Sequence, residues 1–84
     1  MTTSTPKDWS AIGAAAVQHC WFFIRPESFT NTKHPTIHGA ADTASLHWMR
    51  ASQRRKQSNV EAFMDGFITE AKRVAIERGW EVQS

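Results

Sequence analysis

One long amphipathic stretch, residues 58–79, reads SNVEAFMDGFITEAKRVAIERG. Its beginning, Ser58 to Glu61, matches a capping box, in which the serine and glutamate side chains satisfy free backbone amides of the first helical turn. Apolar residues then recur at the three- and four-residue spacing of one helix face. These residues are Val60, Phe63, Met64, Phe67, Ala71, Val74 and Ala75. Because Gly79 stands where a C-terminal cap belongs, the stretch predicts a helix that is capped by Ser58 and ends before Gly79.

Two further helices are predicted upstream of this stretch. The first begins near Pro6, a residue typical of the first helical position, and Pro26 ends it. Its apolar stripe is Trp9, Ile12, Gly13, Ala16, Val17, Cys20, Trp21 and Ile24. The second is capped by Asp42 and runs to about Gln57. Its narrower apolar face is Ala41, Ala44, Ser45, Trp48, Met49 and Ser52.

The chain has 84 residues, which is enough for one small hydrophobic core. We therefore expect residues 1–84 to form a single all-α domain of three helices, with residues 1–5 frayed and residues 26–39 in a loop. An α+β fold is the alternative. In that fold residues 20–25 and 80–83 pair as a short two-stranded sheet, because both segments also have features of short strands.

Composition limits the cellular context of the protein. Hydrophobic residues make up 40% and charged residues 21% of the chain, which is ordinary for a globular protein. Cys20 is the only cysteine, so no disulfide can form within the chain, and polar residues interrupt the longest apolar stretch before it reaches the length of a membrane span. We expect a cytoplasmic protein, in its own cell or in a host cell, with no membrane contact.

Positive charge is concentrated in the predicted second helix. The net charge is only +2, yet no acid lies between Asp42 and Glu61, where Arg50, Arg54, Arg55 and Lys56 contribute four positive charges. Arginines are enriched at protein interfaces and also bind phosphates, so a binding surface is expected on this helix, the preceding loop and the C-terminal tryptophan. Its candidate residues are Arg50, Arg54, Arg55, His47, His34, His38 and Trp80.

No motif for catalysis, a metal ion or a cofactor is recognisable. His34 and His38 have a workable spacing for a metal, but no paired Cys-x-x-Cys or His-Glu-x-x-His accompanies them. His19 and Cys20 are neighbours in the sequence, so their side chains diverge and cannot share a proton. We expect a protein that is not an enzyme and has no metal or cofactor.

Two classes of function fit these features. The first is a protein-binding module, an inhibitor or adaptor of a larger complex, with a partner that has an acidic surface. In size, single cysteine and absence of motifs the chain is similar in kind to small inhibitors from phages and mobile elements that act against host defences, and no motif carries that likeness. The alternative is a small nucleic-acid-binding protein that uses the basic second helix. A homodimer through Phe63, Phe67, Ile68 and Ile76 would cover leftover apolar surface, and a monomer is the alternative, because the first helix adds two tryptophans to the same core.

Overall fold

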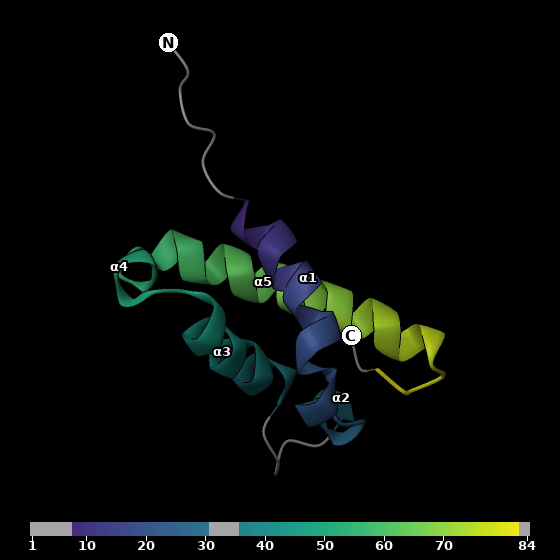
Figure 1. The fold of residues 1–84 in the computed structure, drawn as a ribbon. Coiled ribbons are helices and arrows are strands. Elements are labelled where there is room, and N and C mark those ends of the chain that lie inside the picture. Colours follow the sequence, from purple (N-terminus) through teal and green to yellow (C-terminus); the bar gives the residue numbers. More distant parts are fainter. Residues whose placement is uncertain (1–7, 31–35, 83–84) are drawn as a thin grey trace.

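The computed structural model describes residues 8–30 and 36–82 and places them in a single all-α domain. The three main helices are α1 (Trp9–Cys20), α3 (Ile37–Trp48) and α5 (Gln57–Glu77). Three short segments connect them: the 3-10 helix η1 (Trp21–Phe23), α2 (Glu27–Thr30) and α4 (Ala51–Arg54). The long helix α5 forms the axis of the molecule, α1 crosses its middle, and α3 packs against both of them (Figure 1). The three-helix prediction is confirmed.

The crossing of α1 and α5 is unusually close, because each helix places a glycine at the contact. A Cβ atom on Gly13 would overlap the backbone carbonyl oxygen of Phe63, and one on Gly66 would overlap that of Ser10. The two backbones are therefore in direct contact. This approach lets α1 cover Phe63 and Phe67, whose side chains have no exposed surface.

Helix α5 buries most of the apolar face that its sequence predicts. Val60, Phe63, Phe67, Ala71 and Ala75 are buried, whereas Met64 and Val74 are half-buried at its margins.

The predicted glycine cap of α5 is confirmed. Gly79 has a φ of 81°, in the left-handed region that glycine adopts without strain. The amide of Trp80 donates to the carbonyl of Ala75 at 2.9 Å, and that of Gly79 donates to the carbonyl of Ile76 at 3.0 Å. This pair of bonds is the Schellman motif.

The predicted N-terminal cap of α5 is wrong by two residues, since Lys56 and not Ser58 occupies it, and the capping box is wrong with it. The helix begins at Gln57, so Ser58 lies inside the first turn and is not its N-terminal cap. The preceding chain explains the shift. The amide side chain of Asn59 donates to the carbonyl of Gln53 at 3.1 Å and ties the helix start to α4. Glu61 instead accepts a bond from the side chain of Gln57 at 3.4 Å.

The predicted start of α1 near Pro6 is also wrong. Asp8 caps the helix, and its carboxylate accepts a hydrogen bond from the amide of Ala11 at 3.1 Å. Pro6 itself and the predicted frayed residues 1–5 lie outside the described residues.

The α+β alternative is wrong for the described residues, none of which belongs to a strand. Residues 21–23 form η1, and Ile24 returns to an extended conformation before Pro26. Residues 80–82 have no regular structure, and Gln83 lies outside the described part of the chain. Trp80 instead stacks on Trp21 with ring centroids 5.1 Å apart, so packing by side chains replaces the pairing of strands.

The predicted loop over residues 26–39 is shorter than expected, because it contains α2 and the first turn of α3. Helix α3 begins at Ile37, five residues before Asp42, which is therefore not its cap. The reason lies in burial. Ile37, Ala40 and Ala41 are buried in line with Ala44, so the apolar face of this helix extends further toward the N-terminus than predicted.

The predicted second helix does not continue to Gln57. The backbone is extended at Met49 (φ −122°, ψ 140°) and at Arg50 (φ −76°, ψ 158°), which separates α3 from α4. The interruption places Met49 in the core and leaves Trp48 partly exposed. A new turn starts at once, since the side-chain oxygen of Gln53 accepts a bond from the amide of Arg50 at 2.8 Å.

Within the described residues, no helix combines the length and the apolar character that crossing a bilayer requires.

Candidate binding site

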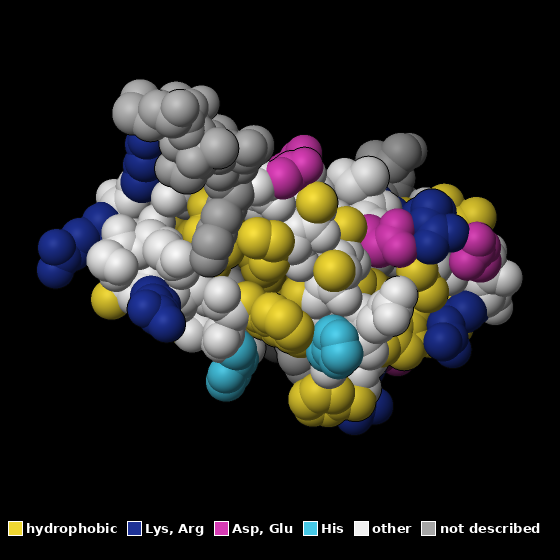
Figure 2. All heavy atoms as spheres, turned by 45° about the horizontal axis from the view of Figure 1, so that its top comes forward, with side chains coloured by type: hydrophobic (Ala, Val, Ile, Leu, Met, Phe, Trp, Pro, Cys, Tyr) yellow, Lys and Arg dark blue, Asp and Glu magenta, His cyan; other side chains and the backbone are white. Residues whose placement is uncertain are grey.

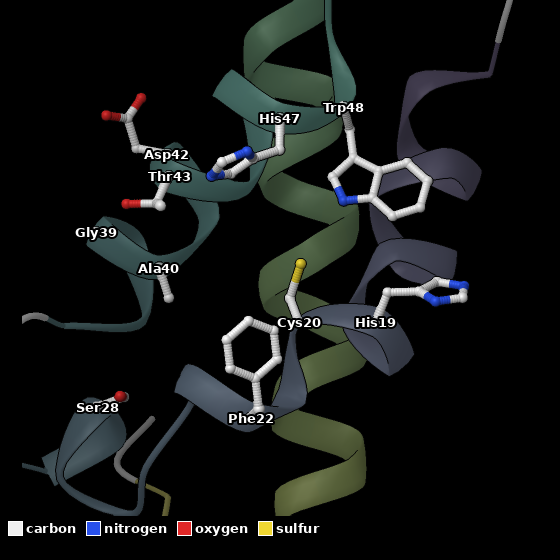
Figure 3. Close-up of a pocket in the computed structure, with 10 residues that line it drawn as sticks. All are labelled: His19, Cys20, Phe22, Ser28, Gly39, Ala40, Asp42, Thr43, His47 and Trp48. Carbon is white, nitrogen blue, oxygen red and sulfur yellow. The ribbon is translucent and has the colours of Figure 1, made fainter.

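A cavity of about 870 Å³ opens between α3 and the end of α1 with η1. Its wall is mainly apolar, and α2 closes one end (Figure 3). The lining residues are His19, Cys20, Phe22, Ser28, Gly39, Ala40, Asp42, Thr43, His47 and Trp48. The volume lies within the range of pockets that bind small molecules or the side chains of a partner. We call this cavity the α1–α3 pocket.

One wall of the pocket combines a buried thiol with an indole. Burial raises the pKa of the Cys20 thiol above its ordinary value, and a hydrogen bond from the side chain of Trp48 lowers it by a smaller amount. The Trp48 ring also lies 5.4 Å from the ring of His19, tilted by 41°. Trp48 therefore connects α3 to the last turn of α1 and forms part of the pocket wall (Figure 3).

Large apolar side chains are exposed around this pocket. Phe22 is 82% exposed and Trp48 is 41% exposed, and both line the pocket. Phe22 rises from η1 beside Cys20, and Trp48 comes from the end of α3 on the facing side (Figure 3). Ring surface of this size is costly to leave in water, and such patches mark interaction sites in small proteins.

The structure brings only part of the predicted binding surface to the pocket. His47 is exposed and lines it. Arg54 reaches its rim through an ion pair with Asp42, with 3.7 Å between the guanidinium nitrogen and the carboxylate oxygen. His38 is exposed on the first turn of α3 and does not line the pocket, whereas His34 lies outside the described residues.

Trp80 is not part of this site. It is half-buried and packs against Trp21 and Phe29, with centroid distances of 5.1 Å and 6.2 Å. Arg78 lies over the other ring of this cluster, 5.0 Å from the centroid of Trp21. The C-terminal tryptophan therefore closes the core.

The basic residues do not form the single helical face that their spacing predicts. The extended residues Met49 and Arg50 interrupt the helix, so His47, Arg50 and Arg54 belong to different segments. Arg50, Arg55 and Lys56 are exposed at the α4 end of the molecule. Arg54 is drawn inward instead, and its buried Nε has no hydrogen-bond partner.

The distribution of charge is visible on the surface. Figure 2 shows a face on which hydrophobic side chains reach the surface between cations at both ends, with histidines beside hydrophobic groups at the lower edge. The cations at the two ends differ. Near the end of α5, Arg73 is neutralised by Glu70 at 2.7 Å and by Glu77 at 2.6 Å, and it lowers the pKa of Glu70. At the α4 end, Asp42 is the one acid from residue 36 to residue 60.

Sequence reasoning missed most of the pocket. The sequence places Cys20 on the apolar stripe of the predicted first helix and Phe22 only in the alternative strand over residues 20–25, which does not predict the exposure of Phe22. A signal does exist, because Phe22 falls off the stripe that Trp21 and Ile24 continue. Ser28 and Thr43 carry no such signal, since only the packing of α2 and α3 brings them to the pocket.

The polar groups that line the pocket do not form a metal-binding cluster among the described residues. Among the described residues, no three His, Cys, Asp or Glu side chains lie close enough together to hold a metal ion. The His34–His38 pair falls partly outside these residues.

Comparison with known proteins gives no family for this chain: no family model, no curated protein and no solved structure matches it.

Proposed function

We propose that this chain is a non-enzymatic protein-binding module, an inhibitor or adaptor, and that it binds through the α1–α3 pocket and the adjacent cations of α4. The observation that carries this proposal is the exposure of Phe22 and Trp48 around a preformed apolar pocket. Aromatic side chains beside a pocket are the usual anchors of protein interfaces.

Charge supports a partner with an acidic surface. Arg50, Arg55 and Lys56 are exposed, and Arg54 already pairs with Asp42. Among the described residues Arg50, Arg55 and Lys56 form no ion pair, and they outnumber Glu61, the acid that follows them on α5. Complementary charge accelerates association and fixes the orientation of a partner, while the aromatic contacts contribute most of the affinity.

The exposed cations also keep a second candidate function, the binding of nucleic acid, in consideration. Phosphates are attracted to arginine and lysine whatever the sequence, with an affinity that falls steeply as salt rises. A phosphate backbone alone makes no use of the apolar pocket. Protein binding accounts for both features of the surface, so it is the function that we prefer.

Arg50→Glu tests the proposed function against the matched control Lys72→Glu. Both substitutions change the net charge by the same amount, and Lys72 lies on α5 outside the pocket. We expect Arg50→Glu to reduce the capture of partner proteins from nuclease-treated lysate about tenfold or more, and Lys72→Glu to retain it. Mass spectrometry with isotope-labelled lysates measures the amount of each partner protein captured by a variant relative to the wild type.

Equal capture by the two variants, with both folds intact by circular dichroism, would exclude this surface as a protein-binding site. Capture that disappears on nuclease treatment of the wild-type sample would favour the nucleic-acid alternative.

A further inference from the structure

We propose that the α1–α3 pocket receives a large apolar side chain from an acidic segment of the partner protein, whose carboxylates face Arg50 and Arg55. This inference rests on the proposed function and specifies the chemistry of the partner. It commits to a polypeptide that carries an aromatic or leucine anchor with acidic residues close by.

The chemistry of the wall favours an apolar anchor. Gly39 and Ala40 provide small apolar surface on α3, and Phe22 and Trp48 provide aromatic surface around the cavity. Two of its polar groups already have partners. The buried Ser28 hydroxyl accepts a hydrogen bond from the backbone amide of Arg25 at 3.3 Å. The Cys20 thiol forms a hydrogen bond with the side chain of Trp48. An apolar group therefore gains contact here without leaving these groups unpaired.

The charges around the pocket favour acidic flanks. The carboxylate of Asp42 is the acid of the pocket lining, and Arg54 lies 3.7 Å from it. Arg50, Arg55 and Lys56 add three exposed cations beyond that pair. A basic segment would be repelled at this end, whereas an acidic one gains attraction to arginines that fork onto carboxylates.

Chain geometry places a cation close to the pocket. Trp48 lines the pocket and Arg50 follows two residues later, so their Cα atoms are at most about 7 Å apart. A carboxylate about one helical turn from the anchor can therefore meet Arg50, since one turn advances about 5.4 Å. A segment of only a few residues can satisfy both contacts.

The same observations favour a polypeptide over a nucleic acid. A single strand stacks its bases on exposed aromatic faces while its phosphates follow a basic groove. Here the aromatic surface leads into a cavity of about 870 Å³ whose lining includes the Asp42 carboxylate. Such a cavity accepts a side chain in depth, whereas a base stacked on an exposed ring leaves it unfilled.

Peptide selection tests the inference on the folded full chain. A display library of random 12-residue peptides is selected against the wild-type protein, and the enriched peptides are sequenced. We expect net acidic peptides that contain Trp, Phe or Leu within four residues of Asp or Glu. Their binding should shift the amide resonances of Cys20, Thr43 and Trp48 in NMR spectra.

Thr43→Trp and Thr69→Trp provide matched variants for this test. Thr43 is exposed and lines the pocket, so an indole there occupies the cavity without entering the core, whereas Thr69 is exposed on α5 outside this pocket. We expect Thr43→Trp to weaken the selected peptides about tenfold or more, and Thr69→Trp to leave their affinity unchanged. Amide spectra confirm that both variants are folded.

Three results would overturn the inference: no enrichment over an empty support, enriched peptides without acids, or equal affinity of the two tryptophan variants. A 12-nucleotide strand that competes with the selected peptides would do the same and assign the site to nucleic acid. These results differ from failure of the proposed function. Partner capture that is lost in Arg50→Glu but kept in Thr43→Trp would retain protein binding through the cations and exclude the pocket, whereas capture kept in both variants would contradict the proposed function as well.

Discussion

Cys20 shows how much a single side chain depends on its surroundings. Its thiol lies at the junction of α1 and η1, where it is buried and forms a hydrogen bond with the side chain of Trp48. A buried thiol resists ionisation, because the thiolate would lose its hydration. Cys20 therefore acts as a small apolar wall residue of the pocket, and low reactivity is expected of it.

The raised pKa of Cys20 predicts a stability that depends on pH. In the unfolded chain the thiol ionises near its ordinary pKa of about 8.5, whereas in the folded protein it stays protonated to higher pH. Proton binding by the folded state then exceeds that of the unfolded state, so the free energy of unfolding falls as pH rises above about 8.5. Urea unfolding between pH 7 and pH 10 measures this fall.

Cys20→Ala is the reference for this prediction. The variant loses some stability at every pH, because removal of the sulfur leaves a small cavity. Its free energy of unfolding lacks the pH dependence that ionisation of the thiol contributes. We expect the wild-type and variant stabilities to converge as the solution becomes alkaline. If the two curves of unfolding free energy against pH stay parallel from pH 7 to pH 10, the Cys20 thiol has the same pKa in the folded and the unfolded state.

At the scale of the elements, the crossing of α1 and α5 governs the rest of the packing. Gly13 and Gly66 allow the two backbones to touch. This contact lets α1 cover the phenylalanines of α5, which are fully buried. The end of α1 is fixed as a result, and with it the wall of the pocket that Cys20 and Phe22 form. A substitution at the crossing should therefore act on stability and on the site together.

Gly66→Ala tests this contact. At an open helical position alanine would stabilise by up to about 1 kcal/mol, because glycine is a poor helix former. Here the added methyl meets the backbone of Ser10, which cannot move without displacing α1. We expect a loss of about 1–3 kcal/mol in the free energy of unfolding, measured with urea.

The exposed position Thr69 on the same helix is the control for this substitution. Thr69→Ala should leave stability unchanged or raise it slightly, in line with helix propensity alone. Stabilisation by Gly66→Ala would mean that the two helices do not touch in solution.

At the scale of the whole molecule, the core leaves little apolar surface on α5 for a second copy of the chain. Phe63 and Phe67, two residues of the predicted dimer surface, are completely buried beneath α1, so that part of the prediction is wrong. Ile68 is half-buried, and Ile76 is 63% exposed. Two isoleucines are far fewer than the roughly 20–30 residues that each partner contributes to a stable interface.

We therefore expect a monomer at micromolar concentration, and sedimentation velocity measures the mass. A concentration-dependent increase toward twice the monomer mass would contradict this expectation. Ile76→Glu would then show whether the contact uses α5, because a charge at that position would disrupt it. If the dimer persists in Ile76→Glu, the exposed aromatic groups around the α1–α3 pocket are the next surface to test.

The sequence alone was sufficient for the features that depend on local periodicity and local conformation. The apolar stripe of α5 and the left-handed turn at Gly79 both follow from neighbouring residues, and the structure confirms them. The concentration of positive charge before Glu61 is likewise a property of composition. For the candidate site, this reasoning identified the cations of α4 and His47.

Tertiary packing was needed for the features that depend on contacts between distant segments. No glycine or proline marks the interruption after Trp48; burial of Met49 accompanies it, and this depends on the core that α1 and α5 create. The start of α3 at Ile37 and the pocket itself likewise follow from how the helices meet. Periodicity states which face of a helix is apolar, but the depth at which two faces pack depends on both partners. The exposure of Phe22 and Trp48, and with it the candidate site, follows from that packing.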